Sequence, residues 1–186
     1  MRSRRSRALL AVVGGSIILG SLGGGGALAV GQSAKVTLRD AGGAAVGHVK
    51  LTQVGDVVTV RADVQGVPPG FHGFHVHAIG MCVPPFTSAG GHFNPTAMSH
   101  GDHAGDMPPL LIMEDGTAST RFQTDRFTVR QLYDTDGSAI IIHADPDNLA
   151  NIPARYHSHT EDVFGPDSAT LATGDAGGRF ACGVVE

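Results

Sequence analysis

The sequence has 186 residues, of which 41% are hydrophobic, and this length and content predict one compact domain with its own core. Thirteen basic and seventeen acidic residues give a net charge of −4, which argues against nucleic acid and anionic lipid as the main partners. The hydrophobic content also excludes an intrinsically disordered chain, and the sequence shows neither a collagen period nor a coiled-coil period.

Residues 1–29 are predicted to be a secretory signal peptide. Four arginines precede an apolar segment, and the cleavage signal Ala27-Leu28-Ala29 follows it. A retained membrane anchor is the alternative, but seven glycines between Gly14 and Gly26 weaken a spanning helix. We therefore expect an exported protein, extracellular, periplasmic or at the cell surface, with no stable membrane insertion after cleavage.

Cleavage would leave a short linker, residues 30–34, followed by one domain, residues 35–186. It removes four arginines and no acid, so nine basic and seventeen acidic residues remain and the net charge becomes −8. Both cysteines, Cys82 and Cys182, stay in the chain. Two cysteines in an exported protein favour a disulfide over a reactive pair.

Short runs of alternating polar and apolar residues follow the linker. Residues 35–39 and 47–51 alternate, and residues 58–64 place every second side chain on one apolar face. Glycine and proline clusters separate these runs, and no helix of ten or more residues is predicted after the signal peptide. The pattern predicts an antiparallel sandwich or barrel, interrupted by two long functional loops at about residues 81–109 and 145–178.

Six of the ten histidines cluster around these two loops together with one acid. His75 and His77 alternate along an apolar strand, so both imidazoles project from one face and can reach the same ion. His143 ends another apolar strand. The remaining candidates lie in the first long loop: His92, His100, His103 and Asp106. Imidazole suits zinc and copper, so the sequence predicts a metal site where the loops meet.

Five motifs resemble the copper–zinc superoxide dismutase family, and they occur in the family's order. They are Gly73-Phe-His-Val-His77, Gly90-Gly-His-Phe-Asn-Pro95, His103-Ala-Gly-Asp106, Ile142-His-Ala144 and Gly174-Asp-Ala-Gly-Gly-Arg-Phe-Ala-Cys-Gly-Val184. The last motif is highly specific by itself, and residues 151–156 look like secreted actinobacterial members. The resemblance implies an all-β fold, a Greek-key antiparallel sandwich or barrel of about eight strands.

The same resemblance implies two metal sites that share one ligand. It implies copper bound by His75, His77, His92 and His143, and zinc bound by His92, His100, His103 and Asp106. His92 would therefore bridge the two metals, and the short spacing of His100 and His103 makes the zinc loop short. Asp102, between those two histidines, is the competing zinc ligand.

The resemblance assigns further roles around the metals. Arg179 would lie beside the open face of copper and orient a small anion, so that Arg179 and His92 are the catalytic residues. Asp147 would link the two sites through hydrogen bonds, although an Asx turn alone explains it nearly as well. Cys82 and Cys182 would form a disulfide that ties the first loop to the last strand.

The implied activity is the disproportionation of superoxide to oxygen and hydrogen peroxide by one-electron cycling of copper, as protection against extracytoplasmic oxidative stress. A non-catalytic copper-binding or copper-delivery sandwich is the alternative. Superoxide would be the small-molecule partner, and the family also contains homodimers. His72 matches a family position whose ring bonds the backbone, whereas His157 and His159 are expected in a solvated loop.

Overall fold

The computed structural model describes residues 31–186, and the expected signal peptide lies outside the described residues. The strands in this range are β1 (Gln32–Asp40), β2 (Ala45–Val54), β3 (Val57–Val64), β4 (Gly70–His72), β5 (Phe74–His77), β6 (Leu110–Ile112), β7 (Ala118–Thr124), β8 (Ala139–His143), β9 (His157–Ser158), β10 (Val163–Phe164) and β11 (Arg179–Val184). One α-helix, α1 (Ser168–Thr173), and two 3₁₀ helices, η1 (Thr87–Ala89) and η2 (Val129–Tyr133), complete the described elements. None of these helices is long and apolar enough to cross a membrane.

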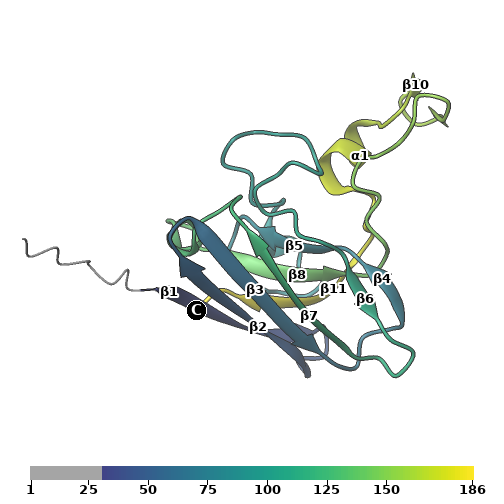
Figure 1. The fold of residues 1–186 in the computed structure, drawn as a ribbon. Coiled ribbons are helices and arrows are strands. Elements are labelled where there is room, and N and C mark those ends of the chain that lie inside the picture. The colour runs from purple at the N-terminus through teal and green to yellow at the C-terminus, as the bar shows by residue number, and fades with distance from the viewer. Residues whose placement is uncertain (1–30) are drawn as a thin grey trace, which may run out of the picture.

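Seven of the strands form one curled antiparallel sheet in the order β5-β8-β11-β1-β2-β3-β7 (Figure 1). Strands β1, β2 and β3 follow one another through short turns, and β11, the last strand of the chain, lies between β8 and β1. The all-β fold class is therefore confirmed. Two further pairs, β4 with β6 and β9 with β10, raise the number of described strands above the eight that were expected.

Gly73 lies between β4 and β5, at the point where the chain leaves one sheet and enters another. Strand β4 pairs with β6 in a two-stranded sheet, whereas β5 pairs with β8 in the seven-stranded sheet. The Gly73 amide donates to the Asp145 carbonyl, and the Gly73 carbonyl accepts from the His143 amide. A side chain at Gly73 would collide with Ala176. Glycine is therefore required at the point where β5 enters the large sheet beside β8.

The hydrophobic core lies inside the curl of the sheet. The alternation in β1, β2 and β3 buries every second side chain, as Leu38, Leu51 and Val60 illustrate, and exposes the polar residues between them. All five residues of β8 are buried. Because β8 pairs with β5 on one side and β11 on the other, the strands that carry His75, His143 and Arg179 have a fixed mutual register.

The expected linker, residues 30–34, is corrected by the structure, because β1 already begins at Gln32. Ser33 pairs with Thr52, and Ala34 pairs with Leu51. The side chain of Ala34 is buried in the core, so pairing and burial both favour an earlier start of the strand.

The two long loops have different shapes. The first, between β5 and β6, contains η1 and is held against β5 by backbone hydrogen bonds. The second, between β8 and β11, contains the β9–β10 hairpin and α1, and the hairpin projects from the body of the molecule (Figure 1). Asp167 caps α1 by accepting from the Thr170 amide, and Gly174 ends it with φ of 62°.

Candidate metal centre

A four-histidine set (His75, His77, His92 and His143) gathers at one end of the sheet. Each residue can offer one ligand atom such that all four atoms lie within 4.8 Å of one another. All four side chains are buried. Strand β5 supplies His75 and His77, β8 supplies His143, and the first loop supplies His92.

Backbone pairing holds the first loop against β5. The Val76 amide donates to the Gly105 carbonyl at 2.9 Å, and the Val76 carbonyl accepts from the Phe93 amide at 2.8 Å. Gly105 lies so close to Val76 that a β-carbon there would collide with its carbonyl. These contacts place His92 beside His77 although the chain separates them by a loop.

A histidine–aspartate set (His92, His100, His103 and Asp106) lies next to the first set and shares His92 with it. Asp106 Oδ1 is 2.9 Å from His92 Nδ1 and 3.2 Å from His103 Nδ1. Asp106 Oδ2 accepts from the backbone amides of Gly101 and His103. Gly101, with φ of 88°, makes the tight turn between the two histidines.

Asp102, the competing ligand, lies outside this set. Its side chain is 71% exposed and its carboxylate is 3.5 Å from the Arg126 guanidinium. Arg126 also donates to the Gly101 carbonyl at 2.7 Å. The geometry therefore favours Asp106 over Asp102 as the carboxylate donor.

Asp147 joins the two sets. Its Oδ2 accepts from His75 Nε2 at 2.7 Å, and its Oδ1 accepts from His100 Nε2 at 2.8 Å. The three side chains are fully buried. Asp147 Oδ1 also accepts from the Leu149 amide at 2.7 Å, so the Asx turn and the link between the sets are both present in one carboxylate.

The Nδ1 atoms of His75 and His100 indicate whether metals fit the two sets. Because Nε2 of His75 and of His100 donates to Asp147, the Nδ1 atoms are left for another partner. Both Nδ1 atoms are buried and have no hydrogen bond within residues 31–186, although His100 Nδ1 lies 3.3 Å from Asp106 Oδ1. Such unpartnered polar atoms are costly, and each belongs to one of the two sets. Imidazole and carboxylate donors in this arrangement fit copper and zinc.

Burial keeps three rings of the four-histidine set, those of His75, His77 and His143, in the neutral form. Burial lowers the pKa of His75 to about 4 and that of His143 to about 3, and burial also places the pKa of His77 well below its usual value. Neutral imidazole is the form that binds metal. No proton therefore competes strongly for these nitrogens at neutral pH.

Two buried carboxylates, Asp106 of the histidine–aspartate set and Asp147 between the two sets, favour positive charge nearby. Burial alone would raise the pKa of Asp106 and of Asp147, but contacts with His100 and other histidines outweigh it and hold both pKa values well below the usual range. Burial opposes a charge on His100, yet Asp106 and Asp147 raise its pKa to about 9. A bound cation would replace that proton between the two carboxylates.

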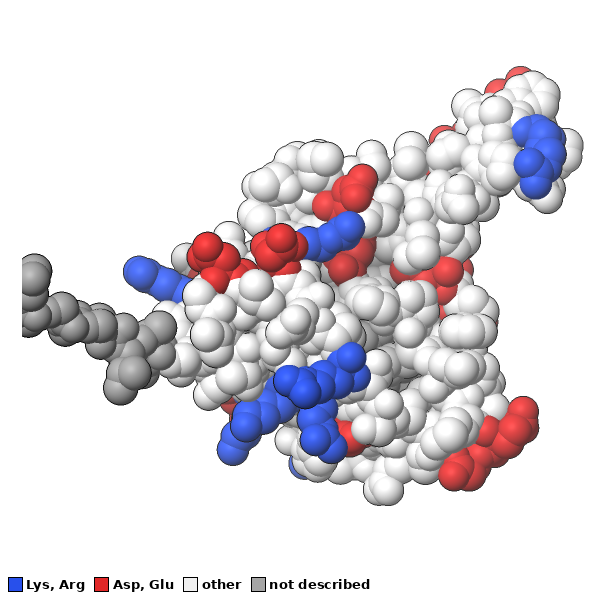
Figure 2. Space-filling view, viewed as in Figure 1, with Lys and Arg blue, Asp and Glu red and all other residues white. Residues whose placement is uncertain are grey.

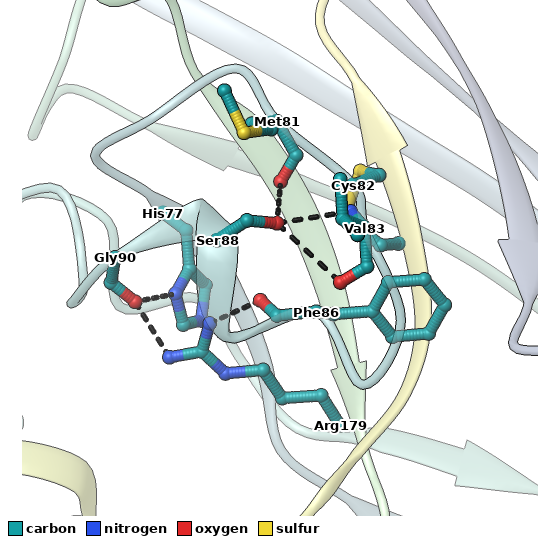
Figure 3. Close-up of a disulfide and its surroundings, with 9 residues drawn as sticks. His77, Met81, Cys82, Val83, Phe86, Ser88, Gly90 and Arg179 are labelled. Carbon is teal, nitrogen blue, oxygen red and sulfur yellow. Dashed lines mark hydrogen bonds between the residues drawn. A yellow bond between two sulfur atoms is a disulfide. The ribbon is translucent and has the colours of Figure 1, made fainter.

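Arg179 is fixed by two carbonyls of the first loop (Figure 3). Its guanidinium donates to the carbonyl oxygens of Phe86 and Gly90. The Gly90 carbonyl also accepts from His77 Nδ1 at 3.0 Å, so one backbone atom links Arg179 to the four-histidine set. The positive charge of Arg179 helps to lower the pKa of His77 and of His143, in addition to burial.

The expected disulfide joins Cys82 to Cys182, with a Cα–Cα distance of 5.6 Å. It attaches the first loop to β11, the strand that begins with Arg179 (Figure 3). Ser88 Oγ accepts from the Val83 amide and donates to the Met81 carbonyl, which closes the loop between the disulfide and η1.

The other histidines behave as expected. The buried His72 ring lies 2.8 Å from the carbonyls of His143 and of Pro68, so it bonds backbone. His157 lies on the projecting hairpin, 2.9 Å from the exposed Asp162, and His159 is exposed beside it. Sequence reasoning missed Arg126 and the Gly90 carbonyl, because neither belongs to a ligand motif.

Comparisons with known proteins agree with this geometry. Residues 45–185 match the family described as copper/zinc superoxide dismutase (SODC). A superoxide dismutase (Cu-Zn) from Mycolicibacterium paratuberculosis is 42% identical over 140 residues, which are 69% of this chain and 62% of the relative's length. One of the same name from Mycobacterium tuberculosis is 39% identical over 168 residues, 83% of this chain and 70% of the relative.

Solved structures show the same likeness. A single mutant of an SOD-like protein from Bacillus subtilis superposes with a TM-score of 0.64 at 29% identity, covering 81% of this chain and 95% of that chain. A double mutant of an SOD-like protein from the same organism superposes with a TM-score of 0.61 at 28% identity, with the same coverage of both chains. The family match covers most of the sequence and contains both donor sets. The chain belongs to the copper/zinc superoxide dismutase family.

Proposed function

We propose that this protein disproportionates superoxide to oxygen and hydrogen peroxide at the metal centre described above. The proposed copper ligands are His75, His77, His92 and His143, and the proposed zinc ligands are His92, His100, His103 and Asp106. The observation that carries the proposal is the pair of buried donor sets that share His92, with Asp147 between them. Family membership and the names of the mycobacterial relatives, superoxide dismutase (Cu-Zn), support it.

Bound copper would supply one-electron chemistry, which zinc cannot, because zinc has no accessible second oxidation state. One superoxide loses an electron and becomes oxygen, and a second gains an electron and two protons and becomes hydrogen peroxide. The protein must therefore attract an anion and deliver protons.

Arg179 attracts and orients the anion in this scheme. Its guanidinium is held by the carbonyls of Phe86 and Gly90, and the latter also holds His77. A fixed positive group offsets the excess of acidic over basic residues elsewhere in the chain.

His92 is the residue to which we assign the movement of a proton. Its Nδ1 lies among the histidine–aspartate set, 2.9 Å from Asp106 Oδ1, which leaves Nε2 for the four-histidine set. We assign to Nε2 the holding and release of one of the protons that the reduced anion needs.

We further propose that residues 1–29 direct export and that the protein acts against superoxide outside the cytoplasm. The basic and apolar pattern with its A-x-A cleavage signal supports export, and a disulfide suits an oxidising compartment.

Metal analysis combined with a superoxide-decay assay tests the proposed function. We expect one copper and one zinc per chain, and catalytic decay that disappears on chelation and returns with copper. Stoichiometric copper without faster decay would instead support the alternative of a copper-delivery domain.

Arg179→Ala is expected to keep both metals and to slow the reaction. The lost contribution is electrostatic, so we expect a decrease in rate of roughly tenfold or more at low ionic strength and a weaker dependence on salt. Arg179→Lys keeps the charge but not the shape of the guanidinium, so its rate should lie between those of the wild type and Arg179→Ala. The measurement is superoxide decay as a function of salt, and an unchanged rate in Arg179→Ala would show that this residue does not guide the anion.

Asp106→Ala should lose zinc, whereas Asp102→Ala should retain it. Asp106 contacts His92 and His103, but Asp102 is exposed and contacts Arg126. Because zinc would hold the loop, its loss should lower the thermal midpoint more than it lowers the activity. Zinc content and thermal unfolding are measured on both variants. Zinc retained by Asp106→Ala and lost by Asp102→Ala would show that Asp102, and not Asp106, is the zinc ligand.

A further inference from the structure

Four basic residues form a row across the outer face of the large sheet. The register places Lys35 of β1 opposite Lys50 of β2, Lys50 opposite Arg61 of β3, and Arg61 opposite Arg121 of β7. All four are exposed. Figure 2 shows lysine and arginine side chains gathered over this part of the sheet. Since neighbouring strands lie about 4.8 Å apart, the row is a line of closely spaced positive charges.

This cation row is costly for the isolated protein. Like charges directly opposite each other on neighbouring strands destabilise a sheet. Arg61 has an ion pair with Asp63 at 2.8 Å, but within residues 31–186 the other three have none. Protection of a sheet edge can explain only Arg121, on the edge strand β7, because Lys35, Lys50 and Arg61 lie on the interior strands β1, β2 and β3. Four of the nine basic residues after residue 30 lie in this one line.

The positions on either side of the cation row are polar and almost all uncharged. One neighbouring row consists of Ser33, Thr52, Thr59 and Gln123, and the other consists of Thr37, His48, Asp63 and Ser119. None of these residues is an apolar or aromatic anchor of the kind that protein interfaces and single-stranded nucleic-acid sites use. Hydroxyl and amide groups beside a line of cations suit a polymer that carries both hydroxyls and anionic groups.

The shape of the charge favours a linear partner over a flat one. Asp63 lies beside the cation row, and Glu186 lies next to Lys35, with which it exchanges two backbone hydrogen bonds. An anionic membrane would face these acids and the acidic remainder of the molecule as well as the row. A single extended polyanion can instead follow the row and contact little else.

From these observations we propose that the cation row binds a linear anionic polysaccharide and so holds the protein in an anionic matrix. The site lies on the outer face of the sheet, away from the buried donor sets in the loops, and is independent of the metal chemistry.

Binding of dextran sulfate to the full protein tests this proposal, with uncharged dextran as the control polymer. The row variant is Arg61→Gln with Arg121→Gln. The matched control is Arg130→Gln with Arg155→Gln, which removes two exposed arginines elsewhere and gives the same net charge. We expect the dissociation constant for dextran sulfate to rise roughly tenfold in the row variant and much less in the control. Arg61→Lys with Arg121→Lys should retain binding.

Two further measurements make the result decisive. Arg61→Gln also removes the exposed ion pair with Asp63, but such pairs contribute little, so the loss of like charges should leave the thermal midpoint of the row variant nearly unchanged or higher. This measurement separates lost binding from lost folding. Equal weakening in the row variant and the matched control would overturn the proposal, since net charge alone would then explain binding. Equal or tighter binding to double-stranded DNA or to phosphatidylglycerol vesicles would also overturn it.

Discussion

Replacing His143 by alanine is expected to remove copper and superoxide dismutation together. His143 ends β8, is buried, and lies with its Nε2 3.3 Å from Nε2 of His77 in the four-histidine set. Alanine offers no donor, and the register of β8 against β5 holds the backbone of residue 143 in place, so the four-histidine set is left with three ligands. Since loss even of a supporting partner costs 10- to 100-fold in metal affinity, we expect activity to fall by roughly a hundredfold or more.

The control for this experiment is His159→Ala, which makes the same chemical change at an exposed histidine on the projecting loop. Copper content and superoxide decay should be unaffected there. Both proteins are compared by copper analysis after dialysis and by thermal unfolding, so that lost binding is separated from lost folding. Retention of full activity in His143→Ala would refute the proposed copper site.

Sequence periodicity predicted the strands well because burial repeats every second residue in them. Residues 58–64 alternate as expected, and β3 spans Val57–Val64. Prediction was weaker where a strand end is decided by pairing, as at Gln32, because Ser33 and Ala34 have neither a turn signal nor a strong strand preference. The β9–β10 hairpin was not predicted, since it has only two residues in each strand.

The candidate site could be predicted as a set of residues but not as a set of contacts. His75 and His77 share a strand face in any register, so sequence alone joins them. His75 and Asp147 are 72 residues apart in the sequence, and their contact depends on how the second loop folds back onto the sheet. The Gly90 carbonyl that holds Arg179 is a backbone atom, and no residue pattern marks it.

The cation row likewise could not be predicted from the sequence, because it depends on strand register. Lys35, Lys50, Arg61 and Arg121 are scattered along the chain and belong to a molecule with more acids than bases. Only the pairing of four strands brings them into one line. Net charge predicts the average electrostatics of a protein, whereas local binding depends on how a fold arranges its charges.

Replacing both cysteines by serine is expected to cause the largest loss of stability. The disulfide joins residues 100 positions apart, and in the chain-entropy model a closed loop of that length contributes about 4–5 kcal/mol to the free energy of unfolding. Without it, the first loop is no longer attached to β11. Phe86 and Gly90, whose carbonyls hold Arg179, belong to that loop, so the activity should fall as well.

Denaturant unfolding and superoxide decay are measured on the Cys82→Ser/Cys182→Ser protein and on a matched loop variant, Ser88→Ala. Ser88→Ala removes the hydrogen bonds to Met81 and Val83 but leaves the disulfide in place, so its loss of stability should be only about 1–2 kcal/mol. Thiol titration of the denatured wild-type protein without reductant should find no free thiol. Two free thiols per chain, or equal unfolding midpoints for the double serine variant and the wild type, would show that this bridge does not stabilise the fold.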